Sequence, residues 1–127
     1  MNKLTMALVL LSTALFSNMA VANPLANTTW QTYEGDKPKA VIKFVENSMG
    51  GVDGTIQSTT RPEGKKLIGT KVVKNLMHDG GKKFSGGYIT DPENGKTYNL
   101  SAQLKGKVLV LKGHYGPFSR SQTWKKQ

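Results

Sequence analysis

The chain contains no cysteine, and this absence excludes several kinds of chemistry. No disulfide can form, no thiol can act as a nucleophile, and no lipid can be attached to an N-terminal cysteine. Small domains in oxidising compartments are often held together by disulfides. This one must rely on the packing of its hydrophobic side chains alone.

Acidic residues and histidines are also scarce. The 127 residues include 8 acidic side chains and 2 histidines, His78 and His114, which lie far apart in the sequence. Nearly all the carboxylates stand at predicted turns, where such groups usually bind nearby backbone N–H groups. No serine triad, carboxylate pair or metal-ligand spacing is evident, and no glycine-rich phosphate loop precedes a helix. We therefore expect a protein that is not an enzyme, with no catalytic residue, no metal and no cofactor.

A long apolar run occurs only at the start of the chain, from Met6 to Phe16. It follows Lys3 and precedes Ala20-Val21-Ala22, which is the pattern of a cleavable secretory signal. An uncleaved membrane anchor is the alternative, but the run is short for a bilayer and no stop-transfer pattern follows it. We predict that residues 1–22 are a signal peptide cleaved after Ala22. Residues 23–127 would then form a single periplasmic or secreted domain with no transmembrane segment.

Positive charge greatly exceeds negative charge. The chain has 18 lysines and arginines, and its net charge is +10. A field of this size favours polyanions such as phosphorylated lipid headgroups, acidic polysaccharide or released nucleic acid. The lysine pairs stand in separate segments, however, which is equally typical of a solvated surface. No nucleic-acid-binding motif is present, so we expect no specific nucleic-acid partner.

Helical periodicity is nearly absent after residue 22, whereas short stretches with a two-residue period recur between clusters of Gly, Asp, Asn and Pro. This pattern predicts an all-β chain of about eight strands in the order of a small antiparallel up-and-down β-barrel. Such a barrel is either filled by side chains or holds one small ligand. Residues 70–77 fit a strand or a helical turn, and strand is preferred because the neighbouring segments are strands. The predicted strands are 28–33, 40–46, 52–58, 70–77, one on each side of a hairpin turn at 91–96, 108–111 and 119–125.

Alternation along a strand predicts which side chains share a face. In the second strand these are Ala40, Ile42 and Phe44. Before the hairpin turn at 91–96 they are Phe84, Gly86 and Tyr88. After that turn they are Tyr98, Leu100, Ala102 and Leu104.

The last strand places Arg120, Gln122 and Trp124 on one face. If Trp124 points inward, so does Arg120, and a guanidinium inside a barrel needs a partner. One interpretation is that Arg120 stacks on Trp30 of the first strand and closes the barrel end. The other is that it binds an anionic ligand. Tyrosine side chains on strand faces either belong to the core or line a pocket, with apolar rings and polar tips. Tyr88, Tyr98 and Tyr115 complete this candidate ligand-binding set.

Several motifs in order resemble a bacterial family catalogued as domain of unknown function 2147. They are Leu67-Ile68-Gly69, the segment from Phe84 through Asp91-Pro92 to Asn94-Gly95-Lys96-Thr97-Tyr98, Gly113-His114-Tyr115-Gly116, and Arg120-Ser121-Gln122-Thr123-Trp124. The departures are Phe84 for the usual tryptophan, Thr28 for a glycine and Ser121 for threonine. The resemblance implies a signal-bearing envelope protein with a barrel similar to lipocalins or streptavidin. It implies no established activity.

Two functions remain open at this point. The first is an exported barrel that binds a small apolar or amphiphilic anion in its mouth, held by the Arg120 set. The second is an interaction module whose basic exterior docks on an acidic envelope component or a partner protein. Salt separates them, because attraction between surface charges weakens with ionic strength whereas binding in a shielded apolar site does not.

Overall fold

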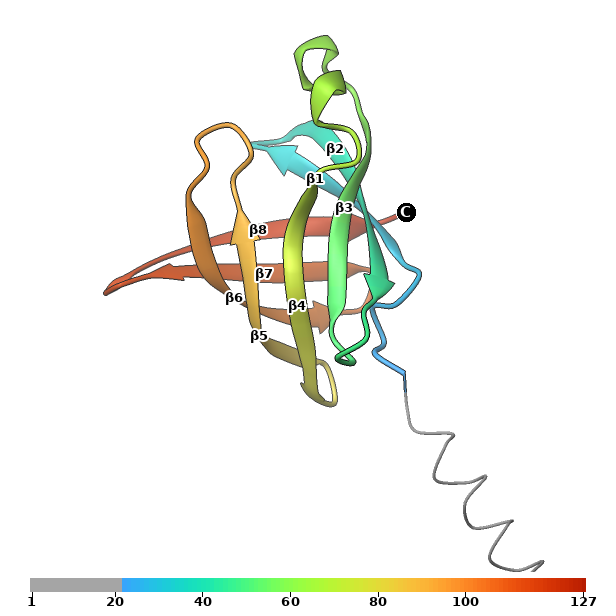
Figure 1. The fold of residues 1–127 in the computed structure, drawn as a ribbon, viewed down its shortest axis with the longest axis vertical. Helices are drawn as coiled ribbons and strands as arrows, with labels where there is room; N and C mark the ends of the chain where they lie inside the picture. The colour runs from blue at the N-terminus through green and yellow to red at the C-terminus, as the bar shows by residue number, and fades with distance from the viewer. Residues whose placement is uncertain (1–21) are drawn as a thin grey trace, which may run out of the picture.

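The structure is a computed structural model that describes residues 22–127, so the predicted signal peptide lies outside the described residues except for Ala22. Within these residues, eight strands and one 3₁₀ helix follow one another (Figure 1). No helix among the described residues is long and apolar enough to cross a membrane. The elements are β1 (Thr29–Glu34), β2 (Lys37–Glu46), β3 (Val52–Thr59), η1 (Pro62–Leu67), β4 (Lys71–Gly80), β5 (Lys83–Thr90), β6 (Thr97–Lys105), β7 (Val108–Tyr115) and β8 (Phe118–Lys126).

The strands form one closed antiparallel barrel in sequence order, which confirms the predicted fold class. Each strand pairs with the next, and β8 closes the sheet on β1 through Trp30 opposite Lys126 and Gln31 opposite Lys125. Closure leaves no long exposed sheet edge. The segment 70–77 is part of a strand, as preferred, but β4 continues to Gly80, and β7 extends through His114 and Tyr115 rather than ending at residue 111.

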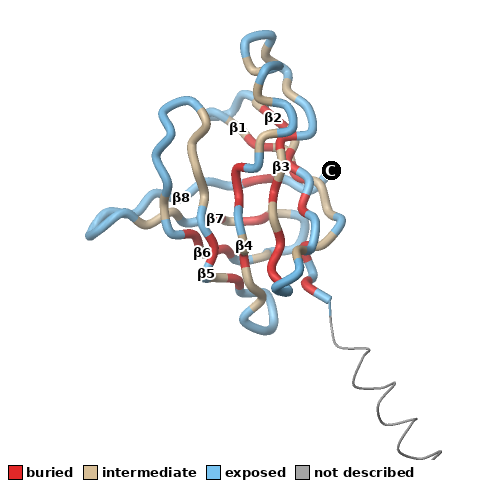
Figure 2. Tube along the Cα trace, in the orientation of Figure 1, coloured by how far each residue is buried: buried red, intermediate tan, exposed pale blue. Residues whose placement is uncertain are grey.

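The two ends of the barrel differ in what covers them. We call the base the end formed by the β2–β3, β4–β5 and β6–β7 turns together with the segment 23–28. We call the mouth the end formed by the β1–β2 turn, the connection that carries η1, the β5–β6 loop and the β7–β8 turn. Burial is concentrated on the strands, whereas the turns and η1 consist mostly of exposed or partly buried residues (Figure 2).

The core is one continuous cluster of inward-facing side chains. Ala40, Ile42 and Phe44 point inward from β2, as their alternation predicts, and Phe44 stacks on Trp124 with ring centroids 6.2 Å apart. In β6, Leu100 and Ala102 are buried while Tyr98 and Leu104 are half-buried on the same face. The largest side chains that are almost fully buried are Trp30, Phe44, Phe84, Leu25, Leu76, Leu109 and Leu111.

The predicted face of β5 is wrong. The pairing of β5 with β6 shifts register between Phe84 and Gly87, which is a β-bulge, and Gly86 has a φ of 74°. A bulge inserts one extra residue and reverses the alternation beyond it. Phe84 therefore points inward, but Tyr88 does not, and 49% of its surface is exposed.

Candidate site at the mouth of the barrel

A cavity of about 510 Å³ opens at the mouth. This volume lies within the range of about 300–1,000 Å³ that is usual for small-molecule sites. Its floor includes Trp124, which is almost fully buried, and its rim includes the end of β1, the β5–β6 loop and the β7–β8 hairpin. The interior is thus packed toward the base and hollow toward the mouth.

The wall of the cavity is mainly apolar. The aliphatic side chains come from β2 to β7, because inward-facing positions on each strand converge on the barrel axis. Near the rim, Tyr98 and Tyr115 contact each other edge to face with centroids 5.8 Å apart. Phe118 follows in the β7–β8 hairpin and is 74% exposed. The aliphatic wall residues are Ala40, Ile42, Ile56, Val72, Ile89, Leu100 and Leu111.

Strand β8 adds a polar stripe to this apolar wall. Proceeding from the floor, Trp124, Gln122 and Arg120 all line the cavity. The indole Nε1–H of Trp124 donates a hydrogen bond of 2.8 Å to Oε1 of Gln122, which fixes the orientation of the Gln122 amide. Within residues 22–127, no ion pair or hydrogen bond engages the guanidinium of Arg120.

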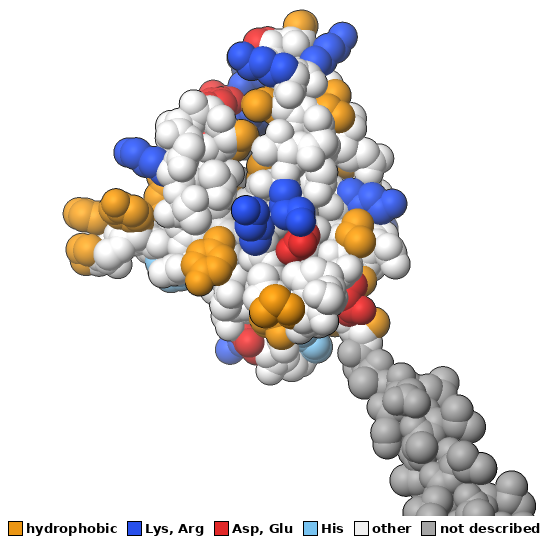
Figure 3. Space-filling view, in the orientation of Figure 1, with side chains coloured by type: hydrophobic (Ala, Val, Ile, Leu, Met, Phe, Trp, Pro, Cys, Tyr) orange, Lys and Arg blue, Asp and Glu red, His pale blue; other side chains and the backbone are white. Residues whose placement is uncertain are grey.

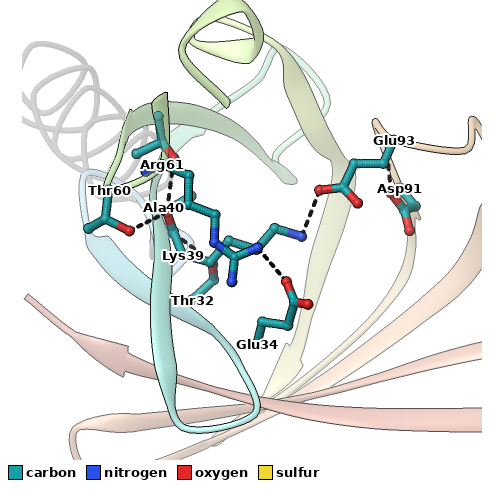
Figure 4. A network of polar contacts seen from close by, with 9 residues as sticks. Thr32, Glu34, Lys39, Ala40, Thr60, Arg61, Asp91 and Glu93 are labelled. Atoms are coloured by element: carbon teal, nitrogen blue, oxygen red, sulfur yellow. Dashed lines mark hydrogen bonds and ion pairs between the residues drawn. The ribbon is translucent and has the colours of Figure 1, made fainter. Parts of the chain in front are cut away.

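Two other cations at the mouth, Lys39 and Arg61, are paired with carboxylates (Figure 4). Lys39, which also lines the cavity, lies 3.1 Å from Oε1 of Glu93 in the β5–β6 loop. Arg61, just before η1, pairs with Glu34 at the end of β1. The hydrogen bond from Arg61, reinforced by its charge, holds the pKa of Glu34 below its usual value.

A second, smaller cavity of about 340 Å³ adjoins the first beneath η1. It shares Lys39, Ala40, Ile56 and Pro92 with the main cavity. Asp91, beside Pro92, reaches the rim of the main cavity, and its Oδ1 accepts the N–H of Glu93 at 2.8 Å. That bond is the turn role predicted for aspartates in this chain.

The structure brings together all but one of the predicted site residues. Arg120, Gln122, Trp124, Tyr98 and Tyr115 line the same cavity. Tyr88 does not line it, because the bulge in β5 turns its side chain to the outside of the barrel.

Arg120 does not stack on Trp30, which corrects one of the two interpretations of this arginine. Trp30 pairs with Lys126 near the base, whereas Arg120 pairs with Gly113 toward the mouth. At about 3.3 Å per strand residue, the two positions on β8 are roughly 20 Å apart. The cation that does lie over an aromatic ring of β1 is Lys125, 5.4 Å from the centroid of Tyr33.

Several site residues were not identified from the sequence. Lys39 stands just before the predicted second strand, and Phe118 just before the predicted last strand. Neither residue was therefore assigned to a face of the sheet. Phe118 lies two positions before Arg120 and so shares its face, which was the available signal. Lys39 is adjacent to Ala40 and so lacks that signal, and it reaches the cavity from a half-buried position at the rim. Thr32 and Tyr33 of β1 also line the cavity.

The histidines lie apart from the cavity. Nε2 of His78 lies 2.8 Å from the carbonyl oxygen of Gly81 at the base, and its ring packs on Phe84. Nε2 of His114 lies 3.3 Å from Oγ of Ser101 on the outer wall, with no carboxylate bound to this pair within residues 22–127. In the same part of the chain, no group of three His, Asp or Glu side chains is placed to hold a metal ion.

Residues 28–126 match the model of a family described as uncharacterised proteins conserved in bacteria, DUF2147. The chain belongs to this family. The match spans all eight strands, and it agrees with the family that the sequence motifs resemble. None of the proteins with curated descriptions matches this DUF2147 chain.

Among solved structures, the chain is similar to protein HP1028 from the human pathogen Helicobacter pylori, which is described as belonging to the lipocalin family. The TM-score is 0.64, with 19% sequence identity over 84% of each chain. At this identity the similarity concerns the fold. This DUF2147 protein therefore has a lipocalin-like barrel.

Proposed function

We propose that this DUF2147 protein is an exported binding protein that holds a small amphiphilic anion in the mouth of its barrel. The observation that carries the proposal is Arg120, which has no carboxylate partner within residues 22–127 and lies on the wall of a largely apolar cavity. The apolar body of the ligand would lie against the aliphatic wall and Trp124. Its anionic group would lie at Arg120, beside Gln122.

Desolvation explains why the ligand should be an anion. While the cavity is open, water can solvate the guanidinium, and a ligand that enters displaces part of that water. A neutral ligand leaves this exposed cation with fewer partners than water gives it, which is unfavourable. An anion replaces the lost water with charge-assisted hydrogen bonds, which a guanidinium forms in a fixed fork geometry. Lys39 is a weaker candidate, since Glu93 already neutralises it.

A matched series of probes tests this idea. Titration calorimetry with decanoate, decanol and decylamine compares one apolar chain bearing three different headgroups. A hydrogen bond to a charged group contributes about 1.5–3 kcal/mol, so decanoate should bind about 10- to 100-fold more tightly than decanol. Decylamine should bind more weakly than both.

Substitution of Arg120 identifies the source of that preference. Arg120→Leu should abolish the advantage of decanoate over decanol by weakening decanoate binding, while decanol should bind as tightly as before or slightly more tightly. Lys112→Leu is the matched control, because Lys112 is exposed and lies between two cavity-lining residues of β7, on the opposite face of the strand. Equal loss in both variants would show that the general positive field, rather than Arg120, selects the anion.

The basic exterior supports a second candidate, docking on an acidic component of the cell envelope. Lysines occur on β2 and on β4 to β8, and on the visible face they are spread out rather than gathered in one stripe (Figure 3). Such binding to vesicles that contain phosphatidylglycerol would weaken steeply between 0.1 and 1 M salt and would not depend on Arg120. Decanoate binding in the cavity should persist across the same range.

A further inference from the structure

The segment that precedes β1 is built into the base of the barrel. Leu25 is fully buried in the core. The N–H of Asn27 donates to the carbonyl oxygen of Phe44 at 2.8 Å, and the N–H of Phe44 donates to that of Thr28 at 2.9 Å. Residues 23–28 thus extend the pairing with β2 and close the base with an apolar side chain.

Asn23 is the anchor of this segment, and only 4% of its surface is exposed. Its side-chain Nδ2 donates to the carbonyl oxygen of Leu76 at 3.1 Å, and its Oδ1 accepts the N–H of Leu25 at 3.0 Å. Its backbone nitrogen donates to Oε2 of Glu46 at 3.0 Å. The residue before it, Ala22, is exposed.

The backbone nitrogen of Asn23 is also the atom that cleavage after Ala22 would change. Hydrolysis of this peptide bond adds one water, so that Ala22 leaves with a carboxylate and Asn23 keeps the nitrogen as an ammonium group. A neutral donor with one N–H then becomes a cation with three. Because a carboxylate oxygen already lies at hydrogen-bond distance, the new charge would form an ion pair without any rearrangement.

We propose that a signal peptidase cuts between Ala22 and Asn23, and that the resulting α-ammonium group of Asn23 pairs with Glu46 as a structural part of the barrel base. The pair ties the first residue of the processed chain to the end of β2. Maturation therefore strengthens the attachment of the segment 23–28, which carries the buried Leu25. This proposal does not depend on what the mouth binds.

The pH dependence of this pair has a definite sign. An α-amino group ordinarily has a pKa of about 7.7–8.0, and a neighbouring carboxylate raises it in the folded state. The stabilisation is then fully present below the unfolded value and is lost as the pH rises through the raised folded value. Among the described residues, the charged group that a hydrogen bond places against this nitrogen is Glu46, at 3.0 Å.

Processing is tested with the full chain. Expressed in a bacterium with an intact export pathway, the protein recovered from the periplasm should have the intact mass of residues 23–127 and an N-terminal Asn23. A product that keeps residues 1–22, or that begins at any other residue, would overturn the assigned cut.

The ion pair is tested with two purified chains, one starting at Asn23 and one retaining Ala22. Both contain every strand and the whole core cluster, so both should fold. In the second chain the nitrogen of Asn23 is an amide, and the exposed Ala22 carries the charge one residue away. The chain that starts at Asn23 should melt a few degrees higher at pH 6–7, which is the size of shift that a modest ion pair produces in a domain of this length.

Glu46→Gln should remove this difference, and so should a pH well above the pKa of the amine. Glu63→Gln, on the exposed η1, is the matched control and should leave the difference intact. NMR titration of the Asn23 α-amine gives an independent measurement: its pKa should lie above the ordinary value and return toward it in Glu46→Gln. An amine pKa unaffected by Glu46 would overturn the ion pair even if the two melting temperatures differ.

Discussion

The base and the mouth of this barrel are made from the same strands, yet they differ in almost every physical respect. At the base, Trp30, Phe44 and Leu109 are nearly fully buried and fill the space between strands. At the mouth, small residues such as Ala40 and Gly113 stand among the aliphatic wall residues, and a cavity remains. The comparison indicates that stability is concentrated at one end, which leaves the other end free to recognise a ligand.

Polar contacts show the same contrast. At the base, Asp53 accepts the N–H of Asn75 at 2.9 Å, lies 3.0 Å from Nζ of Lys71 and accepts Nδ2 of Asn47 at 3.1 Å. These bonds hold Asn75 at a φ of 53°, where β4 shifts register against β3. At the mouth, each ion pair joins a strand to a loop, Lys39 of β2 to Glu93 and Glu34 of β1 to Arg61, through side chains that are partly or largely exposed. The side chain of Asp53 is 19% exposed, whereas those of Glu93 and Glu34 are 59% and 61% exposed, so the carboxylates of the mouth pairs are more open to competition from solvent and ligand.

The largest expected effect comes from breaking the base. Phe44→Ala removes a ring that is fully buried and stacked on Trp124. Loss of such a side chain from a packed core costs about 3–5 kcal/mol, because the cavity left behind is only partly refilled. Urea unfolding of residues 23–127 measures the change.

Phe118→Ala is the corresponding change at the mouth. Its ring is 74% exposed, so the free energy of unfolding should change by less than about 0.5 kcal/mol. If the two variants lost similar stability, the division of the barrel into a stabilising base and a permissive mouth would be wrong.

Much of this fold could be predicted from local sequence. The alternation in β2 and β6 gave the correct inward faces, and turn residues such as Asn94-Gly95 marked the hairpins. These signals are local, because strand alternation and turn geometry depend on neighbouring residues. Tyr88 was misplaced because the bulge before it depends on a distant contact: a Cβ on Gly87 would lie 2.9 Å from the Cα of Leu76 in β4. The adjacent glycines were the available signal, since glycine within a strand often marks a bulge.

The cavity itself could not be predicted. Alternation put Arg120 and Trp124 on one face, but it gave no height along the barrel axis. That height depends on the register of β8 with β7 and β1, which set Arg120 opposite Gly113 and Lys126 opposite Trp30. Whether inward side chains from strands distant in sequence meet or leave a space is a property of the whole closed sheet.

A smaller effect is expected at the polar network of the base. Partial burial would raise the pKa of the Asp53 carboxyl, but the N–H of Asn75 together with Lys71 and Asn47 outweighs it, so the pKa lies below its ordinary value. Asp53→Asn should therefore cost about 1.5 kcal/mol at neutral pH, which is the lower end of the range for hydrogen bonds to a charged group. Guanidinium or urea unfolding at several pH values measures this cost.

The sign of the pH dependence follows from the lowered pKa. The stabilisation by Asp53 is present above the ordinary value of about 3.9 and is lost as the pH falls through the lower folded value. The stability difference between the wild type and Asp53→Asn should thus be constant at pH 5–7 and shrink below about pH 4. Asp36→Asn, in the exposed β1–β2 turn at the mouth, should show no such difference. If the stability difference between the wild type and Asp53→Asn did not change with pH, Asp53 would act through its shape rather than its charge.

The smallest effect is expected at the mouth, and there it concerns binding more than stability. Glu93→Gln removes the partner of Lys39 and leaves a second unpaired cation on the cavity wall. An exposed ion pair contributes about 0–1 kcal/mol, so the free energy of unfolding should change by less than about 0.5 kcal/mol. The affinity for decanoate should rise about two- to threefold, because Lys39 no longer has to exchange one carboxylate for another.

Asp79→Asn separates this local effect from the overall charge of the protein. It also removes one negative charge, but Asp79 is exposed beside the β4–β5 turn at the base and does not line the cavity. Decanoate affinity should therefore be unchanged in this variant. An equal rise in both variants would assign anion attraction to the field of the whole barrel, and the two ends would then differ in packing but not in recognition.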